Sequence, residues 1–248
     1  MVEKKNIKLT LEYDGREYHG WQRQAGDISI QEVLEDRIQL ITNESTRLIA
    51  SGRTDAGVHA LNQVCNFFTT SKISPASMKN GLNSLLPDDI FIRNAEYVSP
   101  EFHSRYSAKS KLYEYRVLNQ SEPDVFLRNY TWHIRSKLDL EKIQSCLSLL
   151  LGRHDFSAFR STGSSNQNPV REIVRAELIR IKNGRISFTL EADGFLRHMV
   201  RNIVGSVIEV GQDRITLDDF KEIMVSRNRQ RAGIKAPPQG LFLSMVKY

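Results

Sequence analysis

The order of predicted elements, β-α-β-β-α-β read twice along the chain, constrains the fold more than any other feature of the sequence. In the first half, short runs of alternating or apolar residues bounded by turn residues predict strands over residues 7–13, 47–50, 61–69 and 89–98. One helix is predicted from residue 30, after the capping box formed by Ser29 and Glu32. The other is predicted from Pro75, which follows the N-cap residue Ser74.

The second half repeats this order. Strands are predicted over residues 111–118, 173–181, 185–192 and 241–246, and helices over residues 139–151 and 196–210. Asn183-Gly184 predicts a tight hairpin, and Thr216 with Asp219 predicts a capping box that opens an added short helix. The sequence therefore predicts an α+β fold of two ferredoxin-like halves, in domains 1–105 and 106–248, whose antiparallel sheets meet and form a central active-site cleft.

Charge and hydropathy limit the classes of partner. The formal net charge is +6 and the sequence pI is about 9.3, which favours a polyanionic partner but is equally compatible with a solvated basic surface. Basic residues interleave with tyrosines over residues 105–116, and arginines gather at residues 227–231. No apolar run approaches the length of a membrane helix, and residues 1–5 lack the apolar core of a signal peptide. We therefore expect a cytoplasmic protein with no membrane partner.

Residues 51–60 carry the densest set of chemically useful side chains. Between two predicted strands this segment reads Ser-Gly-Arg-Thr-Asp-Ala-Gly-Val-His-Ala, so two glycines accompany an arginine, an aspartate and a histidine. Glycines allow a tight turn and the close approach of a ligand backbone. The alternative interpretation is a polar turn whose aspartate caps its own backbone.

This segment resembles the signature loop of the TruA family of pseudouridine synthases. Further segments resemble the family in the same order along the chain, at residues 13–24, 102–115, 152–156, 195–202 and 236–241. The resemblance covers nearly the whole chain. It implies an isomerase that converts uridine to pseudouridine at positions 38, 39 and 40 of the tRNA anticodon stem-loop, and a homodimer that grips one tRNA. The sequence contains neither a Walker nor a Rossmann pattern, and isomerisation needs no carrier, so we expect no cofactor.

The resemblance makes Asp55 the catalytic carboxylate, acting as a nucleophile on the substrate or as a base that removes a ribose proton. For either role Asp55 must be ionised in a partly desolvated site, so a cationic partner is expected. Arg201 matches the family arginine that pairs with this carboxylate. Because Arg201 stands among Met199, Val200 and Ile203 in an apolar helix, burial beside an anion is favoured over a solvated charge on the helix face.

The resemblance also assigns substrate-binding residues. Tyr113 would stack on the uracil and accept the C5 proton, although its alternation with Tyr115 and Val117 also fits a core position. The alternation makes Tyr115 a core or supporting residue. Arg53 would enter the place that the flipped uridine leaves, or contact a phosphate. Leu241 would form the floor of the uracil pocket, or serve as an ordinary strand core residue.

Two other functional classes, an RNA-binding module and a carboxylate hydrolase, compete with the isomerase. A non-catalytic RNA-binding module with a ferredoxin-like sheet would bind single strands by stacking, but the chain lacks the aromatic strand signature of such modules. A carboxylate hydrolase would need a second acid, for which Asp155 is the candidate.

His59 and His198 have no second ligand at zinc spacing, so no metal site is predicted. Trp21 and Gln22 would support an RNA-facing loop, or Trp21 would simply anchor the fold.

Overall fold

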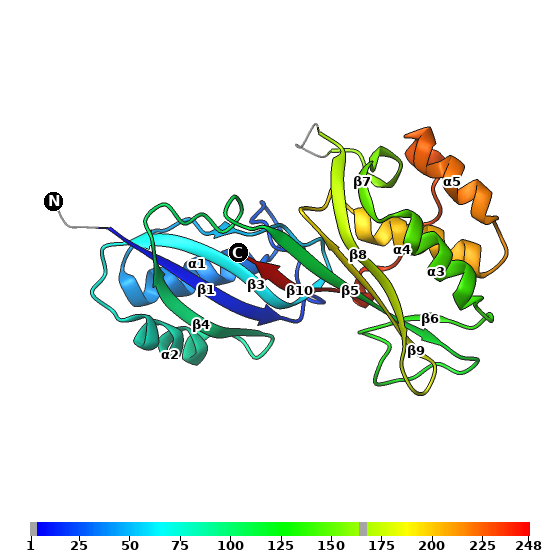
Figure 1. The fold of residues 1–248 in the computed structure, drawn as a ribbon. Coiled ribbons are helices and arrows are strands. Elements are labelled where there is room, and N and C mark those ends of the chain that lie inside the picture. Colours follow the sequence, from blue (N-terminus) through cyan, green and yellow to red (C-terminus); the bar gives the residue numbers. More distant parts are fainter. Residues whose placement is uncertain (1–3, 164–167) are drawn as a thin grey trace. The chain divides into compact units, whose positions relative to one another are not determined.

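The computed structural model describes residues 4–163 and 168–248, which form two compact units (Figure 1). One unit contains the described residues up to Lys109 together with Phe242–Tyr248, and the other is Ser110–Leu241. We call them the N-terminal unit and the C-terminal unit. The last strand of the chain thus belongs largely to the N-terminal unit, whereas the predicted division near residue 105 stays a prediction.

The sheet of the N-terminal unit is mostly antiparallel. Its strands are β1 (Lys5–Tyr13), β2 (Ile49–Ala50), β3 (His59–Thr69), β4 (Ile90–Val98) and β10 (Leu241–Lys247). They lie in the order β4-β1-β3-β10, and β2 also pairs with β3. Leu9 of β1 lies between Cys65 of β3 and Ala95 of β4, whereas β10 runs parallel to β3 through the pair Phe242 and His59. Alternation along β1 gives this sheet one buried face, which includes Leu9.

Helices α1 (Ile30–Thr42) and α2 (Pro75–Leu85) lie against this sheet (Figure 1). The Ser29 hydroxyl accepts a hydrogen bond from the Glu32 amide at 3.3 Å, and Ser74 accepts one from the Ser77 amide at 3.2 Å. Ser29 and Ser74 are therefore confirmed as N-caps, and at Ser29 this is the half of the predicted capping box in which the Glu32 amide donates. The fully buried side chain of Leu34 in α1 contributes to the core of this unit, as does that of Leu82 in α2.

The sheet of the C-terminal unit is also mostly antiparallel. Its strands are β5 (Ser110–Asn119), β6 (Trp132–Ile134), β7 (Gly152–Asp155), β8 (Val170–Arg180) and β9 (Arg185–Ala192). They lie in the order β6-β5-β9-β8-β7, and only β6 runs parallel to its neighbour. Asn183 and Gly184 join β8 to β9 with φ angles of 60° and 68°. These left-handed conformations confirm the predicted hairpin.

Helices α3 (Leu140–Leu149), α4 (Met199–Gly211) and α5 (Leu217–Ser226) pack against one another, and α3 also packs against β8 (Figure 1). Nearly every residue of α4 is buried, because it lies within this unit. The sequence predicted that α4 begins at residue 196, but it begins at Met199, since His198 takes a left-handed φ of 61°. The capping box of Thr216 and Asp219 that opens α5 is confirmed.

The predicted combination of helices with mostly antiparallel strands is confirmed in each unit. Strands β6 and β7 were not predicted, and short 3-10 turns occur at η1 (Ser157–Phe159), η2 (Arg229–Arg231) and η3 (Pro238–Gly240). Across residues 4–163 and 168–248, no helix combines the length and apolar character needed to span a bilayer.

Candidate active site

The loop that carries Asp55 connects β2 to β3 in the N-terminal unit. The Ser51 amide donates to the Val64 carbonyl at 2.8 Å, and the Val58 amide donates to the Asp55 carbonyl at 3.1 Å. These bonds fix the loop at its start and close a tight turn at its end. Between them the Arg53 side chain is exposed and the Asp55 side chain is half-buried. The two charged groups are therefore presented by a backbone that is anchored on both sides.

The segment of residues 13–21 packs directly on this loop. The Trp21 amide donates to the Thr54 carbonyl at 3.1 Å, and Trp21 itself is 1% exposed, so it anchors the fold. A Cβ atom added at Gly20, whose φ is +88°, would lie 2.5 Å from the Thr54 carbonyl oxygen, and one at Gly15 would lie 2.0 Å from the Val58 oxygen. The loop backbone comes so close that only glycine fits at these two positions.

His59 is a buried residue of the same region. Its Nδ1 accepts the Gly15 N–H at 3.2 Å and lies 3.1 Å from an Asp14 oxygen, and its ring stacks on Phe242 at a centroid distance of 4.6 Å. His59 thus ties β3 to residues 14–15 and to β10. Among the residues that the structure describes, no group of three or more His, Cys, Asp and Glu side chains is arranged to hold a metal ion.

Arg201 is buried in α4 of the C-terminal unit and is only 6% exposed. Its Nε donates to the Ala236 carbonyl at 2.7 Å, and the Ala236 amide donates to the Arg201 carbonyl at 3.1 Å. The Nε bond orients the guanidinium group, and the backbone bond ties α4 to Ala236. The interpretation of Arg201 as a solvated charge is wrong, because the side chain is buried; its pairing with an anion stays a prediction. A buried cation beside a neutral carbonyl favours an additional anionic partner.

Tyr113 and Tyr115 point to the same buried face of β5. Tyr113 is 7% exposed and meets Phe195 edge-to-face at a centroid distance of 5.0 Å. The Tyr115 hydroxyl donates to the Pro237 carbonyl at 2.7 Å. Burial raises the pKa of Tyr115 well above its ordinary value, against the opposing charge of Arg201. Tyr115 is therefore a neutral core residue, as the alternation predicted.

Leu241 follows Gly240 at the start of β10 and is 5% exposed. A Cβ atom added at Gly240 would lie 2.8 Å from both the Arg116 carbonyl oxygen and the Tyr115 ring. The chain therefore passes very close to β5 just before Leu241. This burial is compatible with a pocket floor and with a core position, so the assignment of Leu241 to the uracil pocket stays a prediction.

Asp155, the candidate second acid of a hydrolase, is engaged locally in the C-terminal unit. One oxygen accepts the Ser157 amide at 2.9 Å, and the other lies 3.1 Å from Nε of Arg227. Burial acts to raise the pKa of Asp155, but the bonds from Ser157 and the charge of Arg227 outweigh it and hold that pKa below its usual value. Asp155 is therefore an ionised turn cap with a cationic partner, which is a structural role.

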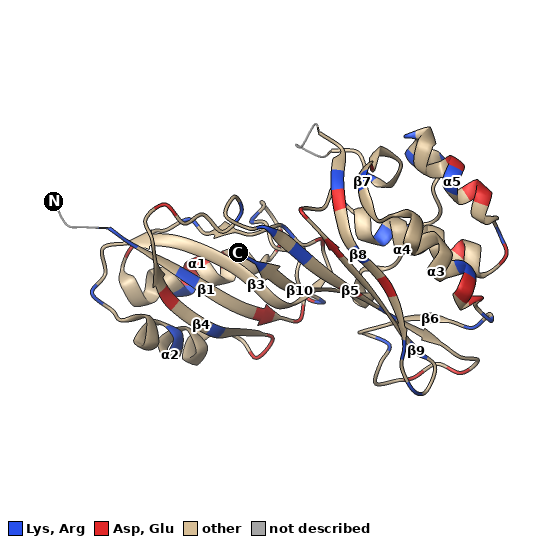
Figure 2. Cartoon of the chain, in the orientation of Figure 1, with Lys and Arg blue, Asp and Glu red and all other residues tan. Residues whose placement is uncertain are grey.

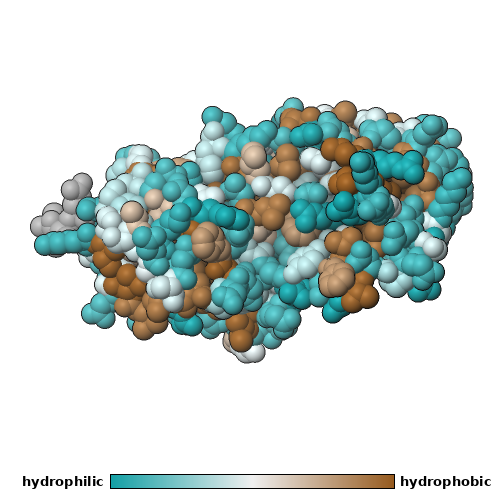
Figure 3. All heavy atoms as spheres, turned by 90° about the horizontal axis from the view of Figure 1, so that it is seen from below, coloured by the Kyte–Doolittle hydropathy of each residue, from teal (hydrophilic) through white to brown (hydrophobic). Residues whose placement is uncertain are grey.

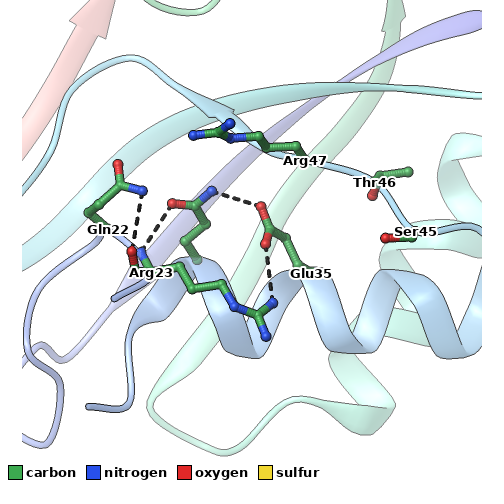
Figure 4. Close-up of a pocket in the computed structure, with 7 residues that line it drawn as sticks. Gln22, Arg23, Glu35, Ser45, Thr46 and Arg47 are labelled. Carbon is green, nitrogen blue, oxygen red and sulfur yellow. Dashed lines mark hydrogen bonds and ion pairs between the residues drawn. The ribbon is translucent and has the colours of Figure 1, made fainter. Parts of the chain in front are cut away.

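A cavity of about 390 Å³ lies beside α1 in the N-terminal unit (Figure 4). Its lining residues are Gln22, Arg23, Gln31, Glu35, Ser45, Thr46 and Arg47, and Asp55 is not among them. The Arg23 guanidinium lies 3.4–3.6 Å from the carboxylates of Glu32, Glu35 and Asp36. Because these acids offset its charge, the cavity is poorly suited to a phosphate, and we assign it no role in the site.

Lysine and arginine are distributed over both units and are interspersed with acidic residues (Figure 2). Helix α5 illustrates this, since Asp218 and Lys221 form an ion pair at 2.8 Å on its exposed surface. The net positive charge is therefore not concentrated on one element.

A family model described as tRNA pseudouridine synthase matches residues 10–107 and 147–248. The match covers most of the chain and includes the Asp55 loop and α4. The chain therefore belongs to the tRNA pseudouridine synthase family, and the predicted enzyme class, an isomerase of this family, is confirmed.

Relatives named tRNA pseudouridine synthase A are similar to the chain over nearly its whole length. The protein of Acetivibrio thermocellus is 46% identical, that of Clostridium kluyveri 45% and that of a Thermoanaerobacter species 44%, each over 98% of this chain and 100% of the relative. Among solved structures, an archaeal box H/ACA Nop10-Cbf5 complex matches 92% of this chain and 59% of that chain, with 11% identity and a TM-score of 0.39, which is too low to carry an argument. The individual roles of Asp55, Arg201, Tyr113, Arg53 and Leu241 stay predictions.

Proposed function

We propose that the protein converts uridine to pseudouridine at positions 38, 39 and 40 of the tRNA anticodon stem-loop, with Asp55 as the catalytic carboxylate. The observation that carries the proposal is the Asp55 loop, in which a half-buried carboxylate projects from a backbone held by Trp21 and closely packed against Gly20. Family membership gives this loop its chemistry. A rigid support is what a catalytic group needs, because precise placement lowers the entropic part of the barrier.

The reaction exchanges one glycosidic bond for another. The bond from ribose C1′ to uracil N1 breaks, the base turns, a bond from C1′ to C5 forms, and the C5 proton leaves while N1 gains one. The carboxylate of Asp55 acts beside the sugar, either by adding to the substrate as a nucleophile or by removing a ribose proton, and it is regenerated at the end.

Arg201 is the cationic partner in this proposal. Its guanidinium is always charged and is held in one plane by the Ala236 carbonyl, so it can offer a fixed fork to a carboxylate. Its burial supports the assignment, because a buried cation is costly unless an anion accompanies it. The proposal further takes each of the two units as a ferredoxin-like half. The order β4-β1-β3-β2 within the N-terminal unit supports this interpretation.

Substrate entry requires the target uridine to leave the helix stack. Flipping a base costs a few kcal/mol, which contacts in the enzyme must repay. The exposed Arg53 is proposed to enter the vacated place, Tyr113 to stack on the uracil and accept the C5 proton, and Leu241 to close the pocket. The edge-to-face contact between Tyr113 and Phe195 supports a defined ring orientation.

The family resemblance also leads us to propose a cytoplasmic homodimer without a cofactor. Apolar side chains remain exposed on both units, and Figure 3 shows hydrophobic patches among polar atoms on the face that it presents. Phe91 is 40% exposed and Phe126 is 89% exposed. The dimer is proposed on the family resemblance, and these exposed side chains are candidates for its interface.

Tritium release tests the proposal. Transfer-RNA labelled at C5 of uridine is incubated with the protein, with Asp55→Asn, and with the control Asp218→Asn, whose carboxylate is 85% exposed on α5. We expect wild type and Asp218→Asn to release tritium, and Asp55→Asn to release none while binding tRNA within about twofold of wild type. Substrates with uridine at only one of the three positions test the specificity. Binding without release by the wild type would instead support an RNA-binding module.

A further inference from the structure

A buried polar network connects the Asp55 loop to β1 and β3 within the N-terminal unit. Its centre is Gln63 of β3, which is fully buried. The Gln63 Oε1 atom accepts from the Ser51 hydroxyl at 2.6 Å and from the Val64 amide at 3.1 Å. Its Nε2 atom donates to the Gly52 carbonyl at 3.0 Å and to the Tyr13 hydroxyl at 3.4 Å. Both the oxygen and the nitrogen of this amide are thus hydrogen-bonded, and each has one partner at the start of the loop, Ser51 and Gly52 respectively.

The network continues from Tyr13 of β1 to Thr54. The Tyr13 hydroxyl lies 2.7 Å from the Thr54 hydroxyl, and the two residues are 4% and 6% exposed. Burial raises the pKa of Tyr13 well above its ordinary value, so the phenol stays protonated. A neutral phenol can accept the Gln63 N–H and donate to Thr54 at the same time.

These bonds hold Gly52 and Thr54, the two neighbours of Arg53. Thr54 also directly precedes Asp55. Gly52 is held through its carbonyl by Gln63. Thr54 is held twice, since its side chain meets Tyr13 and its carbonyl accepts the Trp21 amide. Because Thr54 is held at two points, the peptide plane between Thr54 and Asp55 has little freedom to rotate. The direction in which the next residue, Asp55, leaves the loop is thereby set.

Stability alone does not require polar groups at these positions. Buried hydroxyls and amides cost free energy unless they are hydrogen-bonded, and an apolar core would avoid that cost. Here the polar atoms of Tyr13, Gln63, Ser51 and Thr54 converge on one short loop that carries the proposed catalytic carboxylate. Such convergence is typical of the residues that support a catalytic group.

We infer that Tyr13, Gln63 and Thr54 are positioning residues for pseudouridine formation, and that the hydroxyl pair of Tyr13 and Thr54 is the link that orients Asp55. The inference rests on the catalytic role proposed for Asp55. Since these side chains are buried, they are expected to affect the rate of the chemical step and not the affinity for tRNA.

The test removes single hydroxyl groups and keeps side-chain shape. Tyr13→Phe, Thr54→Val and the double variant are compared by single-turnover rate constants with saturating enzyme and C5-tritiated tRNA. We expect each single variant to be slower by about tenfold and the double variant to be no slower than the singles, because both changes break the same link. Thr54→Ser keeps the hydroxyl and is expected to recover most of the wild-type rate.

Tyr248→Phe is the matched control. Tyr248 is half-buried in the N-terminal unit and its hydroxyl donates to the Ser104 carbonyl at 2.8 Å, so this variant also loses a hydrogen-bonded phenol hydroxyl, but outside residues 13–21. We expect its melting temperature to fall about as much as that of Tyr13→Phe, while its rate constant stays at the wild-type value. A role of Tyr13 in stability alone would make the two variants behave alike in both measurements.

The outcomes separate this inference from the proposed function. Turnover by Asp55→Asn would refute the catalytic role proposed for Asp55. Loss of turnover in Asp55→Asn, together with a wild-type rate in Tyr13→Phe, would overturn only the inference. Rate losses that multiply in the double variant would show that Tyr13 and Thr54 act separately, and weakened tRNA binding at an unchanged rate would refute positioning. Failure of Thr54→Ser to restore the rate would also refute the hydroxyl link.

Discussion

Replacement of Gly20 by alanine is expected to slow catalysis through the backbone of the Asp55 loop. An added Cβ atom would lie 2.5 Å from the Thr54 carbonyl oxygen and 2.9 Å from the Asp55 carbonyl carbon. Ordinary contact between such atoms requires about 3.5 Å, so the loop must move by roughly 1 Å. A misplacement of that size in a catalytic group costs about 100-fold in rate. The left-handed φ of +88° adds a strain of roughly 1–2 kcal/mol to the folded state.

Gly26→Ala separates these two effects. Gly26 has a φ of +89°, but an added Cβ atom there meets nothing within 4 Å. Both variants should therefore lose stability from backbone strain, measured as the free energy of unfolding in urea, and only Gly20→Ala should lose the single-turnover rate. The reasoning fails if Gly20→Ala keeps the wild-type rate, or if Gly26→Ala slows as much as Gly20→Ala does.

The remaining predictions concern charge. Arg201→Lys keeps the charge but loses the planar fork and the Nε–H bond to the Ala236 carbonyl. We therefore expect roughly a 100-fold lower single-turnover rate. A rate within threefold of wild type would contradict the pairing of Arg201 with Asp55. Arg53→Ala is expected to weaken tRNA binding and to release about one ion fewer on binding, so that the slope of log binding constant against log salt concentration falls. Filter binding from 50 to 200 mM salt measures this slope, and an unchanged slope would exclude a phosphate contact. Asp155→Asn loses the ion pair with Arg227. Because the pKa of Asp155 is lowered in the folded state, the wild type should have a larger free energy of unfolding than the variant near pH 7. This difference should disappear as the pH falls below the ordinary carboxyl value of 3.8. A stability difference that is the same at pH 7 and pH 3 would contradict this assignment.

Local signals predicted the elements that depend on local chemistry. Asn183-Gly184 predicted the hairpin, and β9 spans the expected residues 185–192, because the left-handed turn sets the register of both strands. Ser29 and Thr216 predicted the starts of α1 and α5, since a side chain that accepts from the third amide of a helix is readable from the sequence. The signature motif likewise led to the Asp55 loop and to the family.

Features that depend on distant residues were not predictable in this way. Strand β6 has three residues and no alternation of its own, and it forms through pairing with β5. The start of α4 depends on the left-handed backbone of His198, a conformation that is uncommon for any residue other than glycine. The network of Tyr13, Gln63 and Thr54 joins two strands and a loop. A tyrosine and a glutamine that stand 50 residues apart in sequence give no local sign that they meet.

The position of β10 has a consequence for the time order of folding. Phe242–Tyr248 leaves the ribosome after the whole of Ser110–Leu241, although it belongs to the N-terminal unit. The stacking of Phe242 on His59 and the parallel pairing beside Ala60 therefore form late, and across a large separation in sequence. Until the final strand arrives, β3 lacks this neighbour directly after the Asp55 loop. The nascent polypeptide is thus expected to acquire a fully ordered loop only once β10 has been synthesised.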